Sequence, residues 1–194
     1  MTLIAVSKTH SSDIIRIVLS TGHRTFGENR IQESTEKWTQ LKAEYPDVKL
    51  HFIGPFQINK IKKIIELFDV IHSIDRLKLV ELLSREMDNT EHFPECIIQV
   101  NTGEEAQKSG VLPQEADSFI DTCITKFNLP VTGVKCVPPV NSAPEPHFNL
   151  LRQIAKRHSL PVISMGMSRD YKTAIQYGAT HVRVGDSIFG QRKV

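Results

Sequence analysis

The sequence predicts a closed (β/α)8 barrel of the TIM type, formed by one domain that spans residues 1–194. Short apolar runs of strand length alternate with longer runs whose apolar residues recur at helical spacing. Eight of these strand-like runs are present, and this alternation is typical of parallel sheets covered by helices. The chain has 194 residues, of which 40% are hydrophobic, so it can build one full-sized core.

An open doubly wound sheet is the alternative architecture. It would be favoured by a Gly-x-Gly-x-x-Gly pattern after the first strand, because that pattern holds the pyrophosphate of a dinucleotide. No such pattern follows residues 2–7. The sequence therefore favours the barrel.

The eight predicted strands are short, and all but the second contain Val, Ile or Leu. They cover residues 2–7, 25–29, 48–54, 69–73, 96–101, 131–137, 161–163 and 181–184. The helices between them place apolar residues three and four apart, which predicts one buried face for each. They cover about 12–21, 30–43, 57–67, 76–87, 113–127 and 148–155, followed by two short helices. Ser12 and Asp75 are expected to cap the first and fourth helices.

Composition excludes several classes of partner. The 24 basic and 22 acidic residues are dispersed and leave a net charge of +2, so neither a nucleic-acid face nor a membrane surface is expected. No signal peptide or membrane span is visible, and the eight histidines show no metal-ligand spacing. Cys96, Cys123 and Cys136 form no Cys-x-x-Cys pair, which predicts free thiols and a cytoplasmic protein.

Two turns near the end of the chain are the first candidate site. Residues 164–168 follow the seventh strand and residues 185–187 the eighth, and both segments carry Gly and Ser ahead of a helix. The backbone N–H groups of such turns can bind a phosphate group. Loops after strands seven and eight also form the phosphate site of many barrels. The candidate contacts are Ser164, Met165, Ser168, Gly185 and Asp186; ordinary turns that use glycine for positive φ are the alternative.

Lys8 is the second candidate, because it follows the first strand and so faces the same mouth of the barrel. Desolvation at that position would favour the free amine, which is a nucleophile toward a carbonyl group. Together with a phosphate site, this predicts a phosphorylated aldehyde bound as a Schiff base, for which pyridoxal 5'-phosphate is the obvious ligand. A surface lysine that pairs with Glu28 is the alternative.

Two further residues would fit the same ligand. Arg183 ends the eighth strand, and its guanidinium can only donate to a ring nitrogen, which keeps a pyridine neutral. Pairing with the carboxylate of Asp170 or Asp186 is its alternative role. Asn29 could donate to the phenolic oxygen of the ring, or could simply cap a helix. His51 is expected to be a core histidine, and Met165 and Met167 to pack in the core or against a ring.

Several motifs resemble the pyridoxal phosphate homeostasis protein family (YggS/PROSC type), which is related to the barrel domain of alanine racemase. They match in order and spacing over essentially the whole chain: Ala5-Val6-Ser7-Lys8-Thr9, Phe26-Gly27-Glu28-Asn29 with Gln32-Glu33, His51-Phe52-Ile53-Gly54 with Gln57, His72-Ser73 with Asp75, Gln99-Val100-Asn101 with Glu105, Lys108 and Gly110, and the two C-terminal turns. The resemblance implies the alanine racemase barrel fold, a Schiff base on Lys8, phosphate contacts from Ser168 and the turn at residues 183–186, and Arg183 facing the pyridine nitrogen.

The sequence departs from that family at three places. Family members usually begin with a helical segment that precedes the first strand, and this sequence lacks it. Lys135 and Cys136 replace a common Met and a small residue, which places a charge near the mouth. Asp186 replaces a common Thr or Ser, and a carboxylate beside a phosphate is unfavourable. Weaker affinity for the cofactor is expected.

The resemblance implies a carrier that buffers pyridoxal 5'-phosphate and delivers it, without established turnover and so without a catalytic residue. Apoenzymes are expected as partners, and a monomer is the expected state. A racemase would need a second proton-transfer residue, and Tyr45, Tyr171 and Tyr177 all fall on or beside predicted helices. An amino-acid racemase that uses Lys8 as its only base is the alternative. A Schiff-base aldolase acting on a sugar phosphate is a third possibility.

Overall fold

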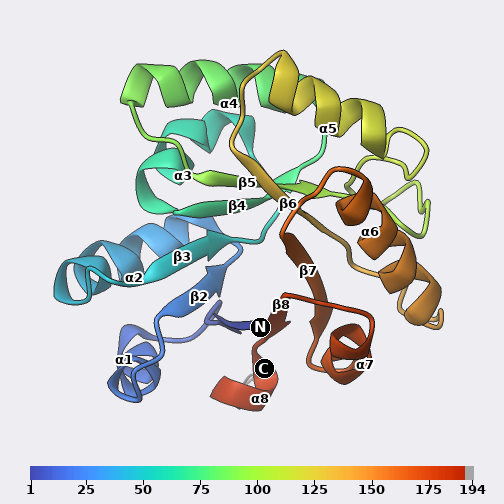
Figure 1. Ribbon diagram of the computed structural model, residues 1–194. Coiled ribbons are helices and arrows are strands. Elements are labelled where there is room, and N and C mark those ends of the chain that lie inside the picture. Colours follow the sequence, from blue (N-terminus) through green and yellow to red (C-terminus); the bar gives the residue numbers. More distant parts are fainter. Residues whose placement is uncertain (191–194) are drawn as a thin grey trace.

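The computed structural model describes residues 1–190, which form a ring of strands surrounded by helices (Figure 1). The strands are β1 (Thr2–Val6), β2 (Thr25–Glu28), β3 (Lys49–Phe52), β4 (Val70–Ile74), β5 (Glu95–Gln99), β6 (Val131–Lys135), β7 (Val162–Met167) and β8 (His181–Val184). All eight pair in parallel and in chain order, and β1 also pairs with β8. This closure confirms the predicted barrel and excludes the open doubly wound sheet.

The helices cover the outer face of the barrel (Figure 1). They are α1 (Ser12–Ser20), α2 (Ile31–Glu44), α3 (Ile61–Leu67), α4 (Leu77–Thr90), α5 (Ala116–Thr125), α6 (Glu145–Arg157), α7 (Tyr171–Gln176) and α8 (Asp186–Phe189), with a 3-10 turn at Ile58–Lys60. Their apolar faces pack against the strands, where Phe26, Trp38 and Phe148 are completely buried. Within residues 1–190 no helix is long and apolar enough to cross a membrane.

Both predicted side-chain caps are wrong. Ser11 occupies the N-cap position of α1 with an extended backbone, and Ser12 is already the first helical residue. The N-cap of α4 is Arg76, and neither helix has a capping hydrogen bond from a side chain. Asp75 Oδ1 instead accepts a hydrogen bond from Arg76 Nη1 at 2.5 Å. The Asp75 carboxylate, which the sequence predicts as the cap of this helix, therefore forms a local ion pair with Arg76 instead.

The end of the seventh strand also differs from the prediction. The sequence indicates a turn from Ser164 onward, whereas β7 continues to Met167. The register between β7 and β8 shifts between Ser164 and Met167, and Gly166 has φ +90° within this irregular stretch. A residue with a side chain would rarely adopt that conformation. Gly166 therefore allows the strand to continue where its composition suggests a turn.

Two histidines form a hydrogen-bonded pair inside the barrel. His51 Nδ1 of β3 lies 2.8 Å from His72 Nε2 of β4, and both side chains are buried. Burial, followed by the charge of His181, lowers the pKa of His51 to about 3. Burial also lowers the pKa of His72 well below its ordinary value. Both imidazoles are therefore neutral at physiological pH, and His51 is a core histidine as the sequence predicts.

This pair should make the fold sensitive to acid. Below pH 6.5 the unfolded chain gains protons on histidines that the folded chain holds neutral, so the free energy of unfolding falls as the pH falls. The slope should approach about 1.4 kcal/mol per pH unit for each buried histidine. Urea denaturation between pH 8 and pH 5 measures it. His72→Gln should give a shallower decline, whereas Gln153→Ala, which replaces an exposed side chain of α6 that does not titrate, should leave the slope unchanged.

Candidate functional site

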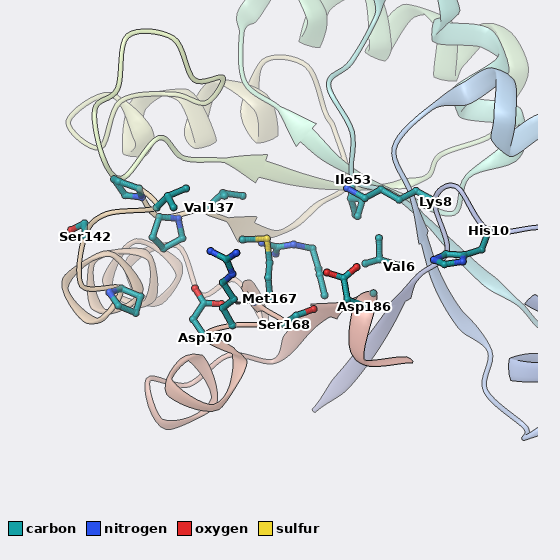
Figure 2. A pocket seen from close by; sticks show the side chains of 17 residues that line it. Val6, Lys8, His10, Ile53, Val137, Ser142, Met167, Ser168, Asp170 and Asp186 are labelled. Carbon is teal, nitrogen blue, oxygen red and sulfur yellow. Dashed lines mark hydrogen bonds between the residues drawn. The ribbon is translucent and has the colours of Figure 1, made fainter. Parts of the chain in front are cut away.

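A cavity of about 450 Å³ opens at the carboxyl ends of the strands (Figure 2). This is the end of the barrel at which active sites of this fold are found, and the volume is that of a small-molecule site. The lining residues come from the ends of five strands and the loops after them. They are Val6, Lys8, His10, Ile53, Val137–Val140, Ser142, Pro144, Met167–Asp170, Arg183, Gly185 and Asp186.

Lys8 lies in the turn directly after β1 and lines the cavity from one side. Its side chain is partly buried and extends over the cavity from the β1 end (Figure 2). The turn continues through His10, which also lines the cavity and stacks on Phe189 with 4.9 Å between ring centroids. His10 is a lining residue that the sequence analysis missed, although its position two residues after Lys8 could have indicated it.

Ser168 and Gly185 line the cavity from the turns that follow β7 and β8. Asp170 Oδ1 accepts a hydrogen bond from Met167 N at 2.7 Å, which closes the turn that contains Ser168. Gly185 lies against the end of β1, where a Cβ atom would be only 3.2 Å from Val6 O. Since α8 has only four residues, its dipole contributes little, and an anion here would depend on individual N–H and O–H groups.

Arg183 forms the inner wall of the cavity from within β8. It is 4% exposed, and it donates hydrogen bonds from Nη1 to Ser164 Oγ at 2.7 Å and from Nη2 to Cys136 O at 2.9 Å. Burial lowers the pKa of Arg183 below its ordinary value. The guanidinium is thus oriented by neutral oxygens, and these hydrogen bonds replace the carboxylate pairing considered as its alternative role.

Sequence comparison places these features in a family. The family model for the alanine racemase N-terminal domain matches residues 1–193. A pyridoxal phosphate homeostasis protein of Aquifex aeolicus is 36% identical over 200 residues, covering 98% of this chain and 87% of that protein. The chain belongs to the pyridoxal phosphate homeostasis protein family. Another pyridoxal phosphate homeostasis protein, from Vibrio cholerae, is 38% identical, and the match covers 98% of this chain and 85% of that protein.

Solved structures of this family have the same fold. PipY of Synechococcus elongatus without PLP superposes with a TM-score of 0.91 at 33% identity, covering 98% of this chain and 93% of that one. The same protein with PLP bound superposes with a TM-score of 0.88 at 32% identity, covering 98% of this chain and 92% of that one. Alanine racemase of Corynebacterium glutamicum gives 0.71 at 18% identity, which shows a shared barrel fold.

Three of the expected contacts are not among the residues that line this cavity. Ser164 and Met165 belong to β7 and are completely buried, and Ser164 instead orients Arg183. Asn29 follows β2, and its carbonyl oxygen would lie 2.1 Å from a Cβ atom at Gly54. The helix N-cap is the next residue, Arg30, so Asn29 is not the cap that was considered as its alternative role. Asp186, in contrast, is exposed and lines the cavity.

Lys135, one of the departures from the family pattern, ends β6 and is buried with 4% exposure. Its Nζ donates hydrogen bonds to Gln99 Oε1 at 2.9 Å and to Ile53 O at 3.2 Å. Burial, followed by the charge of Arg183, lowers the pKa of Lys135 to about 7. The neighbouring Cys136 is buried as well, and burial raises the pKa of its thiol to about 12.

Replacement of Lys135 should change how stability depends on pH. Between pH 7 and pH 10.5 the unfolded chain holds a proton on Lys135 that the folded chain has released. The unfolding free energy of the wild type should therefore rise by up to about 1.4 kcal/mol per pH unit relative to Lys135→Met. Guanidinium denaturation of both proteins at pH 7, 8 and 9 measures this difference. The matched control is Lys62→Met, at an exposed position of α3, for which no such trend is expected.

Proposed function

We propose that this chain binds pyridoxal 5'-phosphate in the cavity at the mouth of the barrel, as a Schiff base on Lys8, and takes part in its homeostasis and delivery. One observation carries the proposal. Lys8, Ser168, Arg183 and Gly185 come from three separate strand ends and line a single cavity. The PLP-bound structure of PipY, a relative with the same fold, supports this choice of ligand.

The residues in the cavity fit the chemical groups of this ligand. Lys8 supplies an amine for the aldehyde, and the turns at Ser168 and Gly185 supply hydroxyl and N–H donors for the phosphate. Arg183 supplies a donor that keeps its proton, because a guanidinium stays charged in proteins. When bound, pyridoxal 5'-phosphate supplies an electron sink, and a donor of this kind weakens that sink by leaving the ring nitrogen unprotonated. Ser164, Met165 and Asn29 stay proposed contacts of the cofactor, and Ser164 also accepts a hydrogen bond from Arg183 Nη1.

A carrier is favoured over an enzyme by the placement of the tyrosines. Tyr171 begins α7, and Tyr45 and Tyr177 are the C-caps of α2 and α7. None of the three lies among the residues that line the cavity described above. The curated relatives are named as homeostasis proteins rather than as enzymes. A racemase-like activity with Lys8 as its base is the alternative, and a Schiff-base aldolase is the less favoured third possibility.

The remaining attributes stay predictions. The three cysteines are buried free thiols, which supports a reducing compartment such as the cytoplasm. Apoenzymes as recipients of the cofactor and a monomeric state are further proposals. The expected single domain includes residues 191–194, which lie outside the described residues.

Lys8→Ala should abolish covalent binding of the cofactor. The wild type mixed with pyridoxal 5'-phosphate should show a yellow imine band, and borohydride reduction should add the cofactor to the peptide that contains Lys8. Lys8→Ala should show neither signal, whereas Lys62→Ala, a lysine on the exposed face of α3, should behave as the wild type. Reduction onto another lysine, or an unchanged band in Lys8→Ala, would contradict the assignment. A wild type that is labelled only after a sugar phosphate is added would favour the aldolase.

The loaded protein should also fail to interconvert or transaminate D- and L-alanine. A racemase requires a second proton-transfer group on the opposite face of the cofactor, and no tyrosine lines this cavity. Chiral chromatography of alanine after long incubation measures the interconversion, and the absorbance of the cofactor measures the transamination. Sustained turnover that disappears in Lys8→Ala would identify an enzyme and end the carrier proposal.

A further inference from the structure

The turn that carries Lys8 is held on both sides of that residue by carboxylates. Ser7 Oγ donates a hydrogen bond to Glu28 Oε1 at 2.7 Å, and the backbone N–H of Thr9 donates to Glu33 Oε1 at 2.5 Å. Glu28 ends β2, and Glu33 lies in the first turn of α2. The residues before and after Lys8 are therefore tied to the neighbouring βα unit.

Thr9 shows why this turn needs support. Its φ is +67°, in the left-handed region that a β-branched residue rarely adopts. A backbone in this region persists only when its surroundings hold it there. The hydrogen bond from Thr9 N to Glu33 is one such restraint, and the hydrogen bond from His10 N to Ser7 O at 3.2 Å is another.

Lys37 connects the two carboxylates. Its Nζ lies 2.7 Å from Glu28 Oε1, 2.7 Å from Glu33 Oε1 and 3.1 Å from Ser7 O. Nζ donates hydrogen bonds to Glu33 Oε1 and Ser7 O, and forms an ion pair with Glu28. Lys37 lies one helical turn after Glu33 on α2, and only 8% of it is exposed. It lies behind the Lys8 turn and is separate from the residues that line the cavity.

Glu28 depends on Lys37 for its counter-charge. Its side chain is completely buried, and its Oε1 also accepts a hydrogen bond from Trp38 Nε1 at 3.1 Å. Within residues 1–190 its other oxygen, Oε2, is buried without a hydrogen-bond partner. A buried carboxylate that loses its cation is strongly unfavourable, so removal of Lys37 would favour movement of the Glu28 side chain. Such a movement would disturb the hydrogen bond from Ser7 Oγ.

We propose that Lys37 is a positioning residue for Lys8: through Glu28 and Glu33 it fixes the turn at residues 7–9 and thereby sets how tightly an aldehyde is held. This inference rests on the proposed function of Lys8. Lys37 acts through other residues and touches no part of the cavity. A pre-positioned amine binds an aldehyde more tightly, because the turn is already ordered before binding.

Affinity measured beside stability tests this inference. Lys37→Met should bind pyridoxal 5'-phosphate roughly tenfold more weakly than the wild type, the size expected for losing a charge-assisted hydrogen bond. The imine absorbance during titration gives the affinity, and denaturant unfolding without the ligand gives the stability. Glu33→Ala removes the restraint on Thr9 at a partly exposed site, and so tests the same turn if Lys37→Met folds poorly.

Lys42→Met is the matched control. Lys42 also lies on α2 and forms a comparable ion pair, with Nζ 2.9 Å from Asp69 Oδ1, but this pair lies away from the Lys8 turn. It should lower stability and leave affinity as in the wild type. Wild-type affinity in both Lys37→Met and Glu33→Ala, or an equal loss in Lys42→Met, would overturn the positioning role while Lys8 remained the site of attachment. A wild type without any imine on Lys8 would instead overturn the proposed function.

Discussion

The pairing of β1 with β8 is the constraint on which the site depends. Four residue pairs, from Thr2 with His181 to Ala5 with Val184, join the first and last strands in parallel register. This register sets the end of β1 against Gly185, with Val6 O close to the Cα of that glycine. The turn with Lys8 and the turn with Gly185 therefore become neighbours although nearly the whole chain separates them. An open sheet would keep these two turns at opposite edges.

The interior of the barrel contains several titratable side chains, and their surroundings determine their charge and their hydrogen-bond partners. The imidazoles of His51 and His72 are neutral and bonded to each other. Arg183 stays charged but has neutral oxygens as its hydrogen-bond acceptors, and Lys135 likewise donates to an amide and a backbone carbonyl. Arg183 brings a positive charge to the cavity and, within residues 1–190, donates no hydrogen bond to a carboxylate, which favours an anionic ligand, whereas the lining carboxylates of Asp170 and Asp186 oppose one. The lowered pKa of Lys135 limits the charge of that side chain near neutral pH.

Much of the architecture and part of the site could be predicted from the sequence. The count of strands followed from alternating apolar runs, and Lys8, Ser168, Arg183, Gly185 and Asp186 followed from their places just inside or after strand ends. These are local properties, so a single sequence carries them. The structure shows where these residues lie, and their binding roles remain proposals.

The surroundings of the expected contacts that do not line the cavity depend on distant residues. The Gly and Ser residues that follow Ser164 predict a turn there. In the structure the Ser164 hydroxyl instead accepts a hydrogen bond from Arg183. The strand continues past it through the irregular register at Gly166. The network of Ser7, Glu28 and Lys37 joins residues up to thirty positions apart, and only the four-residue spacing of Glu33 and Lys37 shows in the sequence. Spacing alone predicts a surface ion pair on a helix. In the structure Lys37 is buried, and the pair of Glu33 and Lys37 contacts the backbone of Thr9 and Ser7.

The groups proposed to bind the aldehyde and the phosphate of the ligand come from different parts of the barrel. The amine is supported from β2 and α2 through Glu28 and Glu33, whereas the phosphate turns belong to β7 and β8. The printed supports of the two regions are different: Glu28 and Glu33 hold the turn at residues 7–9, whereas the Asp170 carboxylate closes the turn that contains Ser168. The two regions become neighbours through the pairing of β1 with β8. Different supports for the amine and for the phosphate would suit the proposed storage and release of an aldehyde cofactor, because attachment could change while the turn at Ser168 kept its structure.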